Sequence, residues 1–238
     1  EHNPMYLTNS YDDPAVMPPH LRQKYNFLES NSAAALIQAI SPNEWTDILD
    51  VLDNFYLEPH NWMRAGGNRG KIAKQIDDMF GELGWKERRL DIETTAHLVD
   101  RSSRIIDTLP TMYQEGYLVD NFKGRVAVDV EWNAKDGNLD RDMTAYRTWH
   151  EAGVLPAGVI ITKDRTEQKE LAQELWDRWN ATLPEAERRL KLPMDVATST
   201  TTNLEKAALR LRRGVMGTCP MLIIGVGKAA WNGEPYRP

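Results

Sequence analysis

The stretch "GRVAVDVEWNAK", residues 124–135, decides how the rest of the chain is interpreted. Its apolar and polar side chains alternate with a two-residue period, which predicts a β-strand with one apolar face. The apolar positions are Val126, Val128, Val130 and Trp132, and those between and beyond them are Ala127, Asp129, Glu131 and Asn133. Carboxylates are rare in a strand of this apolar kind unless they have a partner, so the two acids need an explanation beyond packing.

Asp129 and Glu131 lie two residues apart, so they point to the same face of the strand, about 6–7 Å from each other. Two such carboxylates repel each other unless one holds a proton or both face a cation. Mg²⁺ prefers carboxylate oxygens and keeps several of its waters, so it fits such a pair.

Asp120 precedes Asp129 by nine residues, and the sequence "NFKG" lies between them. This sequence is typical of a tight turn in which Gly124 takes a positive φ. We therefore predict a hairpin that places Asp120 beside Asp129, with both as Mg²⁺ ligands. The same spacing also occurs among solvated acids on an exposed strand, which is the alternative.

The segments after this strand predict an α/β unit. "LDRDMTAYRTWHEAG", residues 139–153, has helical periodicity, with Asp140 as N-cap and Gly153 as the end. "AGVIIT", residues 157–162, follows as a second, buried strand, and the order strand–helix–strand favours a right-handed crossover between parallel strands. The helix carries an apolar stripe of Met143, Tyr146 and Trp149, which is typical of core packing or, alternatively, of a dimer interface.

Elsewhere the pattern is mostly helical. Helices are predicted over 41–58, 68–85 (ending at Gly84), 164–183 (capping box Asp164 and Glu167) and 202–214 (capping box Thr202 and Glu205, ending at Gly214), a strand over 220–227, and irregular chain over 1–20. The fold class is therefore α/β, with an N-terminal helical part packed on a central sheet, in a single domain over 1–238.

The composition is that of an ordinary globular protein, with 41% hydrophobic and 27% charged residues. It has no apolar run long enough to span a membrane and no signal-peptide pattern. The single cysteine, Cys219, suits a reducing compartment, so we expect a cytoplasmic protein. The net charge of −6 argues against a nonspecific nucleic-acid binder but does not exclude a DNA enzyme with acids at a metal site.

"VDNFKGRVAVDVEW" resembles the active-site segment of type II restriction endonucleases of the BglII and BstYI family, which are BamHI-like. "MFGELGWKE" and "RRGVMGTCPMLIIGVG" are similar to other segments of that family, so the resemblance covers residues 70 to 227 in scattered pieces. It implies a PD-(D/E)xK nuclease fold, Mg²⁺ as cofactor, double-stranded DNA as substrate and a homodimer.

The resemblance also implies roles for individual residues. Asp120 and Asp129 match the metal ligands, and Glu131 stands where the wider superfamily has lysine and would orient or deprotonate the attacking water. Asp129 is shorter than the glutamate of BglII-like members. Glu87, in "GWKE", lies near a further site residue of the family, or is a solvated surface glutamate. A competing register makes Glu131 the strand acid, followed by Asn133 and Lys135.

DNA-contacting residues are less clearly marked. "RAGGNRGK", residues 64–71, offers Arg69, Lys71 and backbone amides to a phosphate, or is simply a loop with solvated charges. Lys135 follows the active strand and is a further candidate. "TSTTTN", residues 198–203, contains short donors suited to phosphates or base edges, or caps a helix. Its candidates are Ser199, Thr200, Thr201 and Asn203.

Three functions remain open at this level. The first is a Mg²⁺-dependent, sequence-specific endonuclease that cuts a short palindrome as a homodimer. The second is a nuclease of the same superfamily acting in DNA repair or on RNA. The third is a non-catalytic DNA-binding protein whose acids are merely solvated.

Overall fold

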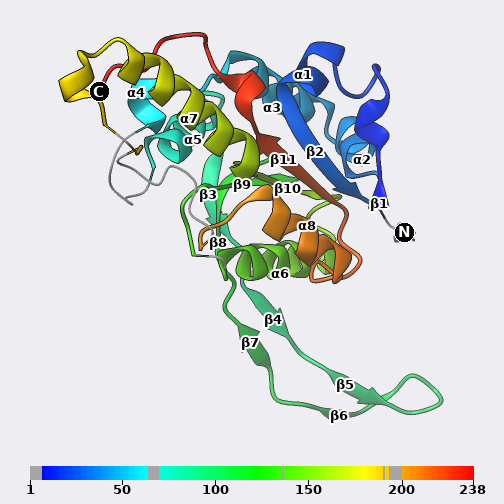
Figure 1. Ribbon diagram of the computed structural model, residues 1–238. Coiled ribbons are helices and arrows are strands. Elements are labelled where there is room, and N and C mark those ends of the chain that lie inside the picture. Colours follow the sequence, from blue (N-terminus) through cyan, green and yellow to red (C-terminus); the bar gives the residue numbers. More distant parts are fainter. Residues whose placement is uncertain (1–6, 64–69, 136, 190, 193–199) are drawn as a thin grey trace.

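The computed structural model describes residues 7–63, 70–135, 137–189, 191–192 and 200–238. Its centre is a mixed β-sheet with the strand order β1-β2-β11-β10-β9-β8-β3 (Figure 1). These strands are β1 Leu7–Thr8, β2 Tyr25–Ser30, β3 Lys86–Arg89, β8 Leu118–Lys123, β9 Val126–Glu131, β10 Gly158–Lys163 and β11 Met221–Val226. The predicted α/β class with a nuclease-like mixed sheet is confirmed.

The three central strands β9, β10 and β11 run parallel. Helix α6 (Asn138–Glu151) links β9 to β10, so the predicted strand–helix–strand crossover is confirmed. All residues of these three strands are buried, which explains their nearly continuous aliphatic sequence. The sheet continues antiparallel on both sides, through β2 next to β11 and β8 next to β9.

Helices cover both faces of the sheet and form two hydrophobic cores. On one face lie α1 Pro19–Lys24, α2 Ala33–Ile40, α3 Pro42–Asn54, α4 Pro59–Trp62, α5 Lys71–Glu82 and α7 Arg165–Ala181. On the other face lie α6 and α8 (Leu204–Arg212), seen together in Figure 1. Short 3₁₀ turns occur at Ser10–Asp12, Glu185–Glu187 and Lys228–Ala230.

The expectation of irregular chain over residues 1–20 is wrong in part, because β1, a 3₁₀ turn and the start of α1 fall within it. Glu29 in β2 supplies the physical reason. Its buried carboxylate accepts hydrogen bonds from the Ser10 amide and hydroxyl, the Thr8 hydroxyl and the Ala34 amide. This long-range network orders a polar segment that carries no periodic signal of its own.

Two of the three predicted helix N-caps differ from expectation. Asp164 does cap α7, accepting from the Glu167 amide at 3.0 Å. In α6, however, Gly137 is the N-cap, and Asp140 lies in the first turn, paired with Arg210 of α8 at 2.7 Å. In α8 the cap is Asn203 instead of Thr202. The predicted helix ends at Gly84, Gly153 and Gly214 are confirmed, each with a positive φ.

The stripe Met143, Tyr146 and Trp149 belongs to the second core, where each side chain is at most 3% exposed. Its interpretation as a dimer interface is therefore wrong. Because these side chains fill the space between α6 and the sheet, they are not free to meet another subunit.

Between β3 and β8 the chain leaves the body as a long antiparallel ribbon (Figure 1). The ribbon contains β4 Ile92–Thr94, β5 His97–Val99, β6 Ile105–Thr108 and β7 Met112–Gln114; β4 pairs with β7, and β5 pairs with β6. We call residues 91–117 the arm. The arm has no periodic signal in the sequence, because its strands are short and have no buried face to impose an alternating pattern.

Candidate active site

The hairpin predicted from "NFKG" is present. β8 and β9 are antiparallel, and Gly124 turns the chain with a φ of +56°. The pair Asn121–Val128 places Asp120 across from Asp129, and the amide of Asp120 donates a hydrogen bond to Asp129 Oδ1 at 2.8 Å. The turn thus brings the first two predicted metal ligands together.

β9 is buried on both faces, although its acids suggested a solvated side as an alternative. Its valines and Trp132 pack in the first core, against α5 and α7. Asp129 and Glu131 point to the other face, beneath α6, where they are 1% and 4% exposed. Because both acids are buried, the alternative of solvated acids on an exposed strand is wrong. Desolvating two carboxylates is costly unless they have partners, so the burial itself calls for a cation or a hydrogen-bond donor.

Helix α6 supplies two charged residues that were not predicted from the sequence. Asp142 is 1% exposed. Arg141 pairs with Asp142 at 2.7 Å and approaches Glu131 Oε1 at 3.6 Å. The signal that could have found them is "DRD", residues 140–142, in the first turn of the helix that directly follows the active strand.

The pKa of each buried carboxyl group in this cluster is raised above its ordinary value. Burial, followed by the charge of Asp142, raises the pKa of Glu131 to about 9. Burial also raises the pKa of Asp129 well above its ordinary value, with further contributions from Asp142 and Asp120. The pKa of Asp142 is raised by burial and held back by Arg141. The cluster contains four carboxyl groups, those of Asp120, Asp129, Glu131 and Asp142, and one cation, Arg141. When the four are ionised, Arg141 alone does not balance their negative charge.

Three oxygens of the cluster have no hydrogen-bond donor among the described residues: Asp129 Oδ2, Glu131 Oε2 and Asp142 Oδ2. Such oxygens are costly when buried, unless a cation or water occupies the space beside them. The described residues contain no group of three or more His, Cys, Asp or Glu side chains arranged to hold a metal ion. Mg²⁺, however, binds through one or two carboxylates and otherwise keeps its waters, so the pair Asp120 and Asp129 fits it.

Lys163 lies at the carboxyl end of β10, beside the end of β9. It is fully buried, and its Nζ donates to Asn133 Oδ1 at 3.1 Å and to Thr201 Oγ1 at 2.8 Å. Lys135 forms an isolated bridge with Thr201, so the segment before α8 lies along the end of the active strand. Lys163 was also missed, although a lysine closing the apolar run "GVIITK" is visible in the sequence.

The other predicted site residues are spread more widely. Glu87 is exposed on β3, and Lys71 is exposed at the start of α5. Thr200 is exposed, whereas Asn203 is 1% exposed and caps α8 through the Lys206 amide at 3.0 Å. Arg69 and Ser199 lie outside the described residues. The catalytic role of Glu87 and the DNA-binding roles of these residues stay predictions.

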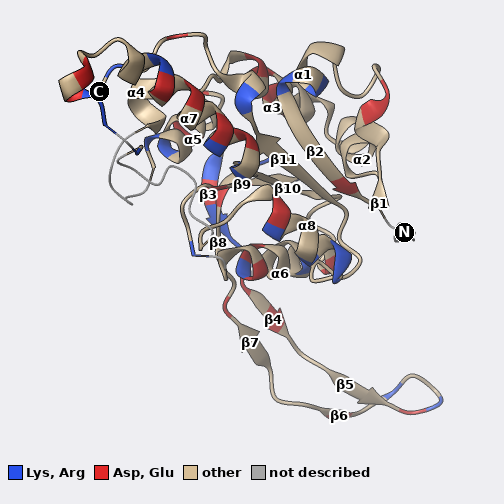
Figure 2. Cartoon of the chain, viewed as in Figure 1, with Lys and Arg blue, Asp and Glu red and all other residues tan. Residues whose placement is uncertain are grey.

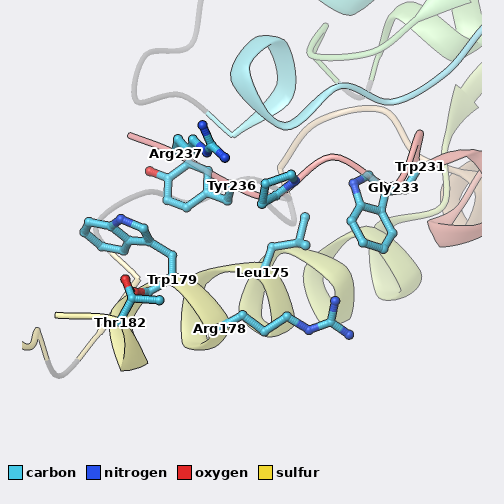
Figure 3. Close-up of a pocket in the computed structure, with 9 residues that line it drawn as sticks. Leu175, Arg178, Trp179, Thr182, Trp231, Gly233, Tyr236 and Arg237 are labelled. Atoms are coloured by element: carbon cyan, nitrogen blue, oxygen red, sulfur yellow. The ribbon is translucent and has the colours of Figure 1, made fainter.

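A pocket of about 380 Å³ lies elsewhere, between α7 and the C-terminal segment 231–237. Trp179, Trp231 and Tyr236 line it together with Arg178 and Arg237 (Figure 3). Trp179 and Tyr236 pack on the first core, on the opposite face of the sheet from Asp129 and Glu131. The pocket is therefore not part of the acidic site.

The central hairpin of a mixed sheet flanked by helices therefore carries Asp120, Asp129 and Glu131 together, the arrangement expected of a PD-(D/E)xK-like nuclease. The family model of restriction endonuclease BglII/BglIII matches residues 25–226. The chain belongs to this family and is a type II site-specific deoxyribonuclease that acts on DNA. No curated protein matches the chain.

Restriction endonucleases of this kind generally depend on divalent metal ions. In the described part of the chain, no helix is both long and apolar enough to cross a membrane.

Proposed function

We propose that the protein is a Mg²⁺-dependent homodimeric endonuclease that hydrolyses both strands of duplex DNA at a short palindromic site. The observation that carries this proposal is the geometry of the Asp120–Asp129 pair. The carboxylate of Asp129 is buried, one of its oxygens accepts a hydrogen bond from the backbone amide of Asp120, and the other has no donor among the described residues. A buried oxygen left in this way is suited to a cation.

The proposed roles follow from the chemistry of phosphodiester hydrolysis. Asp120 and Asp129 would hold Mg²⁺, which supplies charge neutralisation at the phosphate and lowers the pKa of a bound water. Glu131 shares the face of Asp129 and has a free oxygen, so it accepts a hydrogen bond from the attacking water and orients it. A symmetric dimer provides two such sites, one for each strand of a palindrome.

The geometry also supports the register with Glu131 as third residue over the one with Asn133. Glu131 lies beside Asp142 on the face of Asp129, whereas Asn133 lies beyond the end of β9 and accepts from Lys163. Lys135, the last residue of the competing register, is exposed.

Digestion of a long sequenced DNA with Mg²⁺, followed by sequencing of the ends, tests the proposal. We expect discrete fragments with identical palindromic ends, no cleavage in EDTA, and binding with little cutting in Ca²⁺, because Ca²⁺ is larger and activates water less well. Degradation without preferred ends would favour a repair nuclease, and cleavage of RNA alone would favour RNA processing. Binding without any metal-dependent cleavage would leave only a DNA-binding protein.

A further inference from the structure

Lys163 is a fully buried lysine at the carboxyl end of β10, and the proposed chemistry does not use it. Its ammonium donates hydrogen bonds to Asn133 Oδ1 at 3.1 Å and to Thr201 Oγ1 at 2.8 Å. An ammonium is costly to bury, and lysine is almost never fully buried unless it is paired. A lysine at the end of this aliphatic strand therefore needs a reason that packing alone does not supply.

The ammonium of Lys163 fixes which way the side-chain amide of Asn133 faces. A lysine ammonium has donors and no acceptor, so only the oxygen of the amide can face it. The Nδ2 group of Asn133, which carries two N–H donors, is therefore turned away from Lys163. Asn133 is partly exposed, and within the described residues its Nδ2 donates to no other group. The pair thus leaves two donors available beside the active strand.

The backbone on both sides of Asn133 is also held in place. The carbonyl of Glu131 accepts from the Thr162 hydroxyl at 2.6 Å. The carbonyl of Ala134 accepts from the Thr202 amide at 3.1 Å. Donors that are fixed before a ligand arrives lose little conformational freedom when they bind it. The amide of Asn133 is therefore better prepared for a contact than a free surface side chain would be.

The buried charge of Lys163 also makes the two donors of Asn133 stronger. Hydrogen bonds in a chain polarise one another, and the effect is largest in surroundings of low dielectric. An amide whose oxygen accepts from an ammonium therefore has more strongly polarised N–H groups than a free amide. Such donors favour an acceptor that carries negative charge.

The position of Asn133 in the chain indicates a phosphate as this acceptor. Asn133 follows Glu131 by two residues, so the chain between them spans at most about 6–7 Å. The inference rests on the proposed function in one respect, namely that the phosphate being cut lies at Glu131. Because every nucleotide of a strand contributes a phosphate, one next to the cut then falls within reach of Asn133.

The distribution of charge explains why a neutral donor is useful here. Lysines and arginines lie among acids on α6, α7 and α8 and form no separate basic face on these helices (Figure 2). Proteins contact phosphates through asparagine and other neutral donors as well as through cations. The Lys163–Asn133 pair offers a phosphate two polarised donors, while the positive charge itself stays buried under the amide.

We infer that Lys163 is a positioning residue that turns and polarises Asn133, and that Asn133 donates to a phosphate of the cut strand next to the scissile one. A contact of this kind carries no base information, but it fixes how the strand lies against Glu131. Asn133 then contributes to DNA binding and not to the activation of water, because its oxygen is already engaged by Lys163.

Asn133→Ala tests the contact itself. The probe is a short duplex with the cleavage site that sequencing of the digested ends identifies, bound in Ca²⁺ and cut in Mg²⁺. We expect the Kd to rise by ~10-fold, the size typical of a hydrogen bond to a charged group, with little change in the single-turnover rate at saturation. Asn54→Ala is the matched control, because Asn54 is an exposed asparagine that bonds only within α3. It should change neither quantity.

Lys163→Met and Lys163→Gln test the positioning. Both variants replace the lysine with an unbranched, uncharged side chain, but only glutamine keeps an N–H donor for Asn133 Oδ1. We expect Lys163→Met to weaken binding as much as Asn133→Ala does, and Lys163→Gln to weaken it less. Equal losses in the two variants would mean that Lys163 acts through its charge or its packing alone, which would overturn the positioning role.

A methylphosphonate, which replaces one charged phosphate oxygen with a methyl group, identifies the acceptor when it is placed singly at each phosphate flanking the cut. At one position it should weaken wild-type binding by ~10-fold and cause no further loss in Asn133→Ala or Lys163→Met. Variants that are as sensitive as the wild type at every position would overturn the inference. So would a loss that only 7-deazapurines remove, since the acceptor would then be a base edge. If Asn133→Ala binds and cuts like the wild type, the inference alone is wrong, whereas a wild type that cuts no DNA would overturn the proposed function and the inference with it.

Discussion

The backbone amide of Asp120 donates a hydrogen bond to Oδ1 of Asp129, so the two acids are joined across the β8–β9 turn before any ligand is present. The bond satisfies one oxygen of Asp129 and leaves Oδ2 without a donor in a buried setting. Asp129 is therefore held in place by the fold and at the same time left electrostatically unfavourable, as expected for a residue selected for binding a cation.

Asp129→Asn tests this arrangement. The amide oxygen can still accept from Asp120, so the hairpin should remain, whereas the charge needed for the metal is lost. We expect Mg²⁺-dependent cleavage to fall by ~10³-fold or more. We also expect a higher Tm than that of the wild type in EDTA at alkaline pH, where the buried carboxylate of Asp129 is ionised and unbalanced. Plasmid cleavage and thermal unfolding measure the two effects.

Asp78→Asn is the control for this substitution. Asp78 pairs with Lys74 on the surface of α5 and is far more exposed, so its loss should change neither quantity appreciably. If Asp129→Asn cleaves DNA at the wild-type rate, Asp129 is not a metal ligand.

The role of Glu131 in orienting the attacking water through a side-chain oxygen can be tested by substitution. If it orients water through an oxygen, Glu131→Gln should keep weak Mg²⁺-dependent cleavage, whereas Glu131→Ala should keep none. Single-turnover cleavage at saturating protein separates this effect from binding, which both variants should retain. Equal rates for the two variants would mean that the oxygen is unused and would support the register in which Asn133 is the third residue.

The hairpin and its acids could be predicted from the sequence because their signals are local. The two-residue period of β9, the turn residues ending in Gly124 and the spacing of Asp120 from Asp129 all lie within sixteen residues. The sequence signals for three helix ends were equally local, because the glycine that follows each helix takes the positive φ that glycine adopts most readily. These glycines are Gly84, Gly153 and Gly214.

Features that depend on distant contacts were not predictable in this way. Asp140 looks like an N-cap, but Gly137 fills that place and Asp140 pairs with Arg210, 70 residues away. β2 joins the sheet beside β11 although nearly two hundred residues separate them. Asp142 is spaced like any polar residue of α6, and only the packing of that helix over β9 makes it part of the site.

Arg141 and Asp142 give a further prediction, because Arg141 contacts both Asp142 and Glu131. We expect Asp142→Asn to leave DNA binding unchanged and to lower the cleavage rate by roughly 10–100-fold, the size typical of residues that orient a metal site. Arg141→Gln should have a similar effect and Arg141→Lys a smaller one, because a cation is kept. Single-turnover rates and KM, measured separately, distinguish positioning from loss of binding.

Arg178→Gln is the matched control for these arginine substitutions. Arg178 pairs with Glu174 on the surface of α7, away from the acids, so its loss should leave cleavage intact. A global loss of Tm in Asp142→Asn would show that Asp142 serves folding alone, and the prediction would then be wrong.

The buried acids also make the metal-free protein sensitive to pH. The pKa of Glu131 is raised from 4.5 to about 9, first by burial and then by Asp142. Between these values the unfolded chain has lost the proton that the folded chain still holds, so the folded state binds more protons. The free energy of unfolding must then fall as pH rises from about 5 to 9, and Asp129 and Asp142, whose pKa values are also raised, act in the same direction.

Urea unfolding in EDTA at several pH values, followed by tryptophan fluorescence, measures this slope. Glu131→Gln should flatten it in part, since the other two acids still titrate, and added Mg²⁺ should stabilise the wild type most at the alkaline end, where the carboxylates are ready to bind it. A wild type whose stability rises over this range, or a Glu131→Gln variant with the same slope, would show that Glu131 is already ionised in the folded protein.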